Sequence, residues 1–121
     1  MKNILLLASL IIFTISCTWE SEEMLYPEPE ACDTTNVSFS EDVKPILSAN
    51  CFECHSNVNA PDFAFGITLE DYEDVKASLN LIVGAINHKE GFPAMPRGAE
   101  KLDTCAINTI EAFANAGAPN N

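Results

Sequence analysis

The feature that most constrains this chain is the stretch CFECH, residues 51–55, which has the form C-x-x-C-H. Two thiols three positions apart lie close together on one turn of chain. Such a pair can bind a metal, cycle between dithiol and disulfide, or carry a covalently attached cofactor. Each use requires different partners elsewhere in the sequence, so the remaining cysteines and histidines help to decide between the three.

The first sixteen residues, MKNILLLASLIIFTIS, combine a basic start with an apolar run. The run is short for a membrane-spanning helix and typical of a signal peptide core. It ends at TISC, where a small residue precedes Cys17; this resembles the lipobox of bacterial lipoproteins, with Thr14 in place of the usual leucine. We expect a lipoprotein signal peptide over residues 1–16 and lipidation of Cys17. An ordinary signal peptide and an uncleaved anchor are the alternatives.

Residues 17–36 are rich in Glu and Pro and show no apolar period, which predicts an acidic, extended tether. A folded domain is expected over residues 37–121. The formal net charge of −12 at pH 7 disfavours electrostatic binding to nucleic acid or to an anionic membrane. Membrane attachment is therefore expected to come from the lipid, which places the domain outside the cytoplasm, on the periplasmic side or at the cell surface.

The apolar residues of the folded part recur with a helical period, and no segment alternates as a strand does. The expected fold is all-α, with three to four short helices and long loops. The expected helices cover residues 40–50, 69–80, 81–88 and 104–116. Pro45 favours Ser40 over Ser38 as the first cap, and Thr68 and Asp103 are the expected caps of later helices. Long loops are unusual in a small stable domain, so something buried is expected to organise them.

The chain contains five cysteines. Cys17 is the candidate for lipidation, and Cys51 and Cys54 belong to the C-x-x-C-H motif. Cys32 and Cys105 remain, one near each end of the folded part. Thiols of exported proteins are usually oxidised or occupied, so we expect a disulfide between Cys32 and Cys105. Free buried thiols and metal ligands are the alternatives.

The three uses of the thiol pair can now be compared. A zinc site needs four ligands, usually as two close pairs, and no second close pair accompanies Cys51 and Cys54. A thioredoxin-like dithiol needs a βαβ context, which the helical pattern does not supply. C-x-x-C-H is also the attachment signature of a c-type haem, with thioethers at the two cysteines and His55 as the proximal iron ligand. One haem c is therefore the expected cofactor.

A distal iron ligand is expected from the loop Gly91–Gly98, GFPAMPRG, where Met95 lies between two prolines. A methionine that fills a gap in the core is the alternative. His88 is a second candidate for the distal position. Arg97 is the candidate contact for a haem propionate, and a solvated surface arginine is an equal alternative. Six apolar side chains are candidates for the haem pocket: Phe63, Phe65, Ile67, Ile82, Ile86 and Phe92.

Taken together, these segments resemble small bacterial class I cytochromes c of the mono-haem lipoprotein type. The resemblance rests on SEDVKPILSANCFECH at residues 40–55, FPAMP at residues 92–96 and ANAGAP at residues 114–119. It covers roughly residues 33–121. C-x-x-C-H alone is moderately specific, and its combination with a downstream Met-Pro loop and a closing helix is strongly so.

The resemblance implies an all-α fold in which the first and last helices cross beside the haem. It also implies the site residues, namely Cys51 and Cys54 at the thioethers, His55 on the proximal side and Met95 on the distal side. The chain departs from the family pattern in its last helix, where Phe113 is the only aromatic residue and stands for the usual Tyr or Trp. This departure affects the expected contact between the first and last helices, where the aromatic side chain would pack.

The expected function is the transfer of single electrons between redox partners by a lipid-anchored cytochrome that is not an enzyme. Met ligation raises the potential relative to two histidines. The acidic surface predicts redox protein partners with a basic or apolar docking patch, and no small-molecule substrate is expected. Two alternatives remain: an accessory cytochrome subunit of a larger membrane redox complex, and a haem-based sensor with an open or displaceable distal site.

Overall fold

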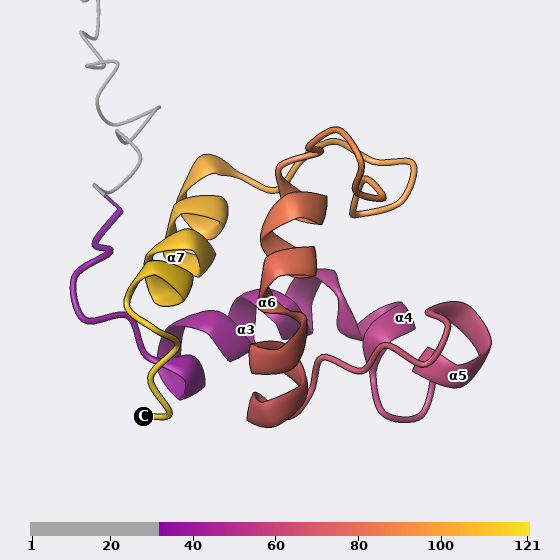
Figure 1. Ribbon diagram of the computed structural model, residues 1–121, viewed down its shortest axis with the longest axis horizontal. Coiled ribbons are helices and arrows are strands. Elements are labelled where there is room, and N and C mark those ends of the chain that lie inside the picture. The colour runs from indigo at the N-terminus through magenta and orange to yellow at the C-terminus, as the bar shows by residue number, and fades with distance from the viewer. Residues whose placement is uncertain (1–31) are drawn as a thin grey trace, which may run out of the picture. The chain divides into compact units, whose positions relative to one another are not determined.

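The computed structural model describes residues 32–121, and within this range the secondary structure is helical, with no strand (Figure 1). The elements in chain order are η1 (Phe39–Val43), α3 (Lys44–Asn50), α4 (Phe52–His55), α5 (Ala60–Phe63), α6 (Tyr72–Ile86) and α7 (Thr104–Asn115). None of the helices in this range has both the length and the apolar character needed to cross a bilayer. The expected signal peptide, Cys17 and most of the expected tether lie outside the described residues.

The first helical segment is capped by Ser38, and the expectation of Ser40 was wrong. The Ser38 hydroxyl accepts a hydrogen bond from the Glu41 N–H at 3.0 Å, and the Ser38 N–H donates to the Asp42 carboxylate at 2.7 Å. These reciprocal bonds resemble a capping box, except that the acidic side chain comes from Asp42, one residue after the usual position. The turn that follows is π-helical, so Pro45 falls in the first turn of α3, where its missing N–H is tolerated.

Helix α6 differs from the sequence expectation at both of its predicted boundaries. It begins at Tyr72 after Asp71, and the expected cap Thr68 instead donates its hydroxyl to the Asp74 carboxylate at 2.6 Å. It also continues through Leu81 without the expected break, because no proline interrupts its backbone hydrogen bonds. The short helix α5 lies in a stretch that we expected to be a loop.

Helix α7 agrees with the expectation at both ends. The Asp103 carboxylate accepts a hydrogen bond from the Ala106 N–H at 2.9 Å, which caps the first turn. Gly117 follows the last turn with a φ of +83°, a conformation that glycine adopts without a steric penalty. The Ala118 N–H then donates to the Phe113 carbonyl at 2.9 Å and satisfies one of the last helical carbonyls.

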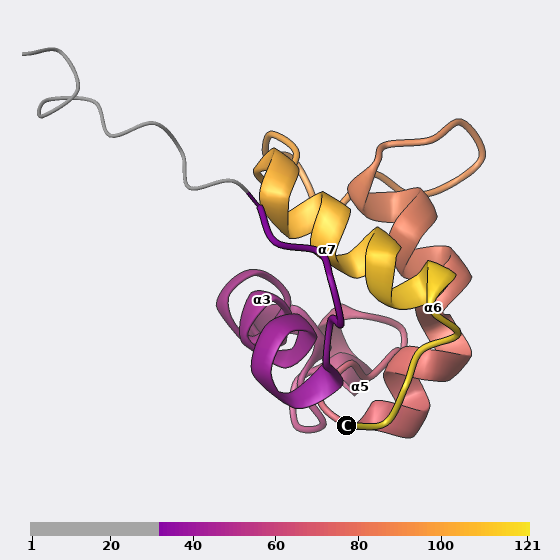
Figure 2. The same ribbon diagram turned by 90° about the vertical axis from the view of Figure 1, so that its left-hand side faces the viewer.

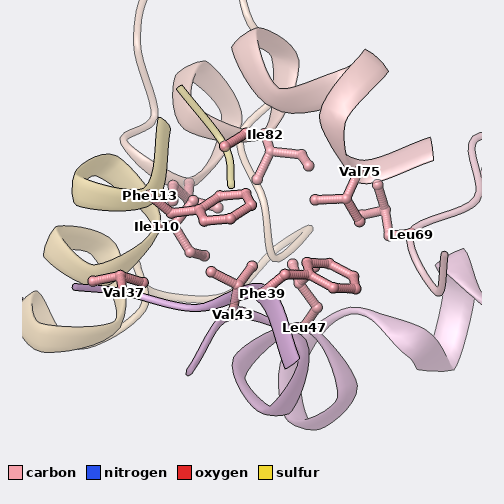
Figure 3. Close-up of a cluster of buried hydrophobic side chains, with 11 residues drawn as sticks. Val37, Phe39, Val43, Leu47, Leu69, Val75, Ile82, Ile110 and Phe113 are labelled. Atoms are coloured by element: carbon pink, nitrogen blue, oxygen red, sulfur yellow. The ribbon is translucent and has the colours of Figure 1, made fainter. Parts of the chain in front are cut away.

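The hydrophobic core lies where α7 meets η1 and α6 (Figures 2 and 3). Phe113 is completely buried, and its ring centroid lies 6.2 Å from that of Phe39. Phe39 in turn meets Tyr72 edge to face at 5.4 Å. Phenylalanine thus occupies the crossing contact in the last helix. The largest fully buried side chains are Phe113, Leu47, Ile110, Val43 and Val75.

Both ends of the described chain are attached to this core. The sulfur atoms of Cys32 and Cys105 lie 2.07 Å apart, at disulfide-bonding distance, and join the start of the described chain to the first turn of α7. At the other end, the Asn121 carbonyl accepts hydrogen bonds from the Ser40 N–H at 3.2 Å and the Ser40 hydroxyl at 2.9 Å. Residues 32–36, which the sequence assigned to the tether, are therefore fastened to α7.

The aromatic contact at the helix crossing predicts a large effect of truncation. Phe113→Ala should lower the free energy of unfolding by about 3–5 kcal/mol, because it leaves a cavity at a fully buried position. Urea denaturation of the purified protein measures this change. Asn108→Ala, at an exposed position of the same helix, is the matched control and should change stability by less than about 0.5 kcal/mol. Equal effects of the two substitutions would contradict the assigned core.

Candidate functional site

A cavity of about 590 Å³ lies between α6, the segment from the end of α3 to Leu69, and the loop that follows α6. Figure 1 shows α4 and α5 on one side of α6 and α7 on the other. The volume is within the range of about 300–1,000 Å³ that is typical of ligand sites. The walls are largely apolar, and the acidic Glu53 is among the residues that line them. The cavity is also lined by Cys51, Cys54, His55, Met95 and Arg97. These are the five cofactor-contact residues that the sequence singled out.

His55 is oriented by a partner that the sequence did not indicate. Its Nδ1 lies 2.9 Å from the Ile67 carbonyl oxygen. A carbonyl only accepts hydrogen bonds, so Nδ1 carries the hydrogen, and in the neutral ring the lone pair is on Nε2. The Leu69 N–H donates to the His55 carbonyl at 2.9 Å and fixes the same segment from the other side. The His55 ring is therefore held in one tautomer, with Nε2 free of this hydrogen bond.

The two motif cysteines differ in their surroundings, and neither is in a disulfide. Cys54 is exposed, whereas Cys51 is partly buried and burial raises its thiol pKa to about 11. A protonated thiol is a poor nucleophile, so burial lowers the reactivity of Cys51 at neutral pH. Among residues 32–121, no three His, Cys, Asp or Glu side chains gather in a group suited to a metal ion.

Met95 reaches the same cavity from the loop after α6, and the end of that helix holds its backbone. Its N–H donates to the Ala85 carbonyl at 3.1 Å, and its carbonyl lies 3.1 Å from the Nε2 of His88. The peptide bond to Pro96 is cis. Arg97 follows at an exposed position on the cavity rim. His88, the second candidate for a distal ligand, does not line the cavity.

The apolar wall contains five of the six expected pocket residues. Phe63, Phe65, Ile67, Ile82 and Ile86 line the cavity. Phe92 does not, and its expected place in the pocket was wrong. Its ring packs against α6 at Gly84, where a Cβ atom would overlap the ring. The missing side chain of Gly84 lets the phenyl ring approach the helix, an interaction that neither residue signals in sequence.

Several of the apolar wall residues are half-exposed or more. Phe63 is 65% exposed, Phe65 89% and Leu81 50%. A soluble domain rarely leaves large apolar side chains gathered in one place unless they contact a ligand or partner. Comparisons of the chain with protein-family models, with curated proteins and with solved structures found no match.

The packing of Phe92 on Gly84 predicts that replacing Gly84 with alanine will lower stability, although a glycine-to-alanine change in a helix usually raises it. Gly84→Ala would ordinarily stabilise a helix by about 1 kcal/mol, but here we expect it to destabilise the protein because the new Cβ meets the Phe92 ring. In a Phe92→Ala background the obstruction is gone, and Gly84→Ala should then stabilise. Thermal unfolding of the four proteins measures this coupling.

Ala77→Gly, at an exposed position of α6, provides the matched control for helix propensity. It should destabilise the protein by about 1 kcal/mol whether or not Phe92 is present. A stabilising Gly84→Ala in the wild-type background would contradict the contact between Gly84 and Phe92.

Proposed function

We propose that this chain is a lipid-anchored, extracytoplasmic mono-haem c-type cytochrome of the class I type, which transfers single electrons between redox partners. The observation that carries the proposal is the meeting of the C-x-x-C-H motif and Met95 at one apolar cavity. Residues 51–55 and Met95 are far apart in sequence, and nothing in a generic helical packing requires them to share a cavity.

The residues at the cavity fit a covalently held haem. Cys51 and Cys54 would hold it through thioethers, and the Nε2 of His55 and the sulfur of Met95 would serve as the axial ligands. When bound, the haem supplies a one-electron iron couple. Phe63, Phe65 and the other apolar wall residues would exclude water from it. The hydrogen bond from His55 Nδ1 to the Ile67 carbonyl fixes the orientation of the ring and leaves Nε2 free to serve as the ligand.

The distribution of exposed apolar side chains favours an electron carrier over an accessory subunit. Within the described range, five large apolar side chains are exposed, and four of them line the cavity: Phe63, Phe65, Ile67 and Leu81. Only Val58, 82% exposed, lies apart from it. A permanent subunit interface would need an apolar patch elsewhere on the surface. The anchored tether and the acidic net charge of −12 complete the proposal, with partners that present a basic or apolar patch.

The first test is whether the exported, purified protein carries covalent haem. We expect a haem stain that survives denaturing electrophoresis and the visible spectrum of a c-type cytochrome. In the double variant Cys51→Ala/Cys54→Ala the stain should disappear, since both thioether sites are gone. A colourless wild-type protein, or one that contains stoichiometric zinc, would overturn the proposal.

The second test concerns the distal ligand. Met95→Leu keeps the apolar volume but removes the thioether, so the weak far-red absorbance band of a methionine–iron bond should vanish. The reduced variant should then bind carbon monoxide. Lys101→Gln, at an exposed position of the same loop that does not line the cavity, is the matched control and should keep the band. A band that persists in Met95→Leu would show that Met95 is not the ligand and would contradict its assignment.

A further inference from the structure

We propose that His88 is a positioning residue for the distal ligand: its ring holds the Met95 backbone in place through a hydrogen bond to the Met95 carbonyl. This inference rests on the proposed haem function and deepens it. His88 is separated from Met95 by a loop that contains Gly91 and Pro93. Its Nε2 lies 3.1 Å from the Met95 carbonyl oxygen, and the contact is partly buried.

The hydrogen bond closes a small network at the end of α6. The Ala85 carbonyl accepts hydrogen bonds from both the His88 N–H and the Met95 N–H, each at 3.1 Å. The His88 ring then returns to the Met95 carbonyl. Hydrogen bonds thus connect Ala85 and His88, at the end of α6, to Met95 in the loop that follows. Both the N–H and the C=O of the Met95 backbone have a hydrogen-bond partner there.

The backbone conformation of His88 is part of this arrangement. His88 has a φ of +51°, in the left-handed region, where the chain leaves the axis of α6. The Lys89 N–H donates to the Gly84 carbonyl at 3.0 Å and holds this turn. An ordinary residue at this position would carry some strain, so a test must separate the backbone preference from the ring contact.

The ring acts through Met95 and not as a ligand itself. Because the Met95 carbonyl can only accept, His88 Nε2 carries the hydrogen, and the residue does not line the cavity. The remaining ties of this loop are few: the Phe92 ring on Gly84, and the Phe92 N–H to the Lys89 carbonyl at 3.1 Å. Loss of the His88 bond therefore leaves Met95 attached at its N–H alone. Supporting partners of metal ligands typically contribute ten- to a hundredfold to metal affinity or activity.

The test uses three variants of the full exported chain. His88→Asn keeps a residue that tolerates the left-handed region, but its amide matches Nδ1 and is too short to replace Nε2. His88→Gln places an amide N–H close to the position of Nε2 and is the conservative rescue. Asn87→Ala is the matched control: Asn87 bonds the Val83 carbonyl at 3.0 Å and the Glu111 carboxylate at 2.8 Å, and makes no recorded hydrogen bond to the Met95 loop.

We expect His88→Asn to retain covalent haem and to lose most of the methionine–iron band, with carbon monoxide binding gained in the reduced form. Amide hydrogen exchange at Met95 should become roughly two- to tenfold faster, the factor expected for the loss of one hydrogen bond. His88→Gln should restore the band. Asn87→Ala should keep it, whatever its effect on stability.

An unchanged band in a haem-bearing His88→Asn protein would overturn the positioning role and leave the proposed function intact. Equal loss of the band in Asn87→Ala would also overturn it, since the effect would then be a general loosening of the end of α6. A wild-type protein without haem would overturn the proposed function itself, and this inference with it.

Discussion

The structure depends on helix α6, which serves as the wall between the hydrophobic core and the cavity. Val75 and Ile82 pack into the core with Phe113 (Figure 3), while Leu81 and Ala85 line the cavity. The end of the helix also holds the loop that carries Met95. Protein interiors are close-packed and resist small displacements. Helix α6 therefore fixes the core, the apolar wall and the loop that carries Met95 relative to one another.

This arrangement explains how a small domain with long connections can define a site. The core is formed on one side of α6 by η1, α3 and α7, and the Cys32–Cys105 pair and the Asn121 contacts fasten the ends of the described chain to it. On the other side, apolar side chains face a cavity and have few protein neighbours. A large apolar group in that cavity would complete the packing there, which is why the fold and the proposed cofactor support each other.

The two histidines show how backbone carbonyls assign roles to identical side chains. In His55, which lines the cavity, the hydrogen bond to the Ile67 carbonyl uses Nδ1 and leaves the lone pair of the neutral ring on Nε2. In His88 the bond to the Met95 carbonyl uses Nε2 itself. The proposed roles of the two rings, one as a ligand and the other as a support, follow from this difference, although both side chains are partly buried.

The sequence by itself determined the residue types of the site, the all-helical character of the described domain and the ends of α7, because these depend on local spacing and on the caps Asp103 and Gly117. It failed at the caps of η1 and α6, where several Ser, Thr and Asp side chains compete and only packing selects among them. It also misplaced Phe92, whose partner is an absent side chain at Gly84. Only the tertiary structure decided which nitrogen of each histidine is used in a hydrogen bond and which keeps its lone pair. Every residue has a backbone carbonyl, so the sequence does not indicate which carbonyl the fold will bring next to a histidine ring.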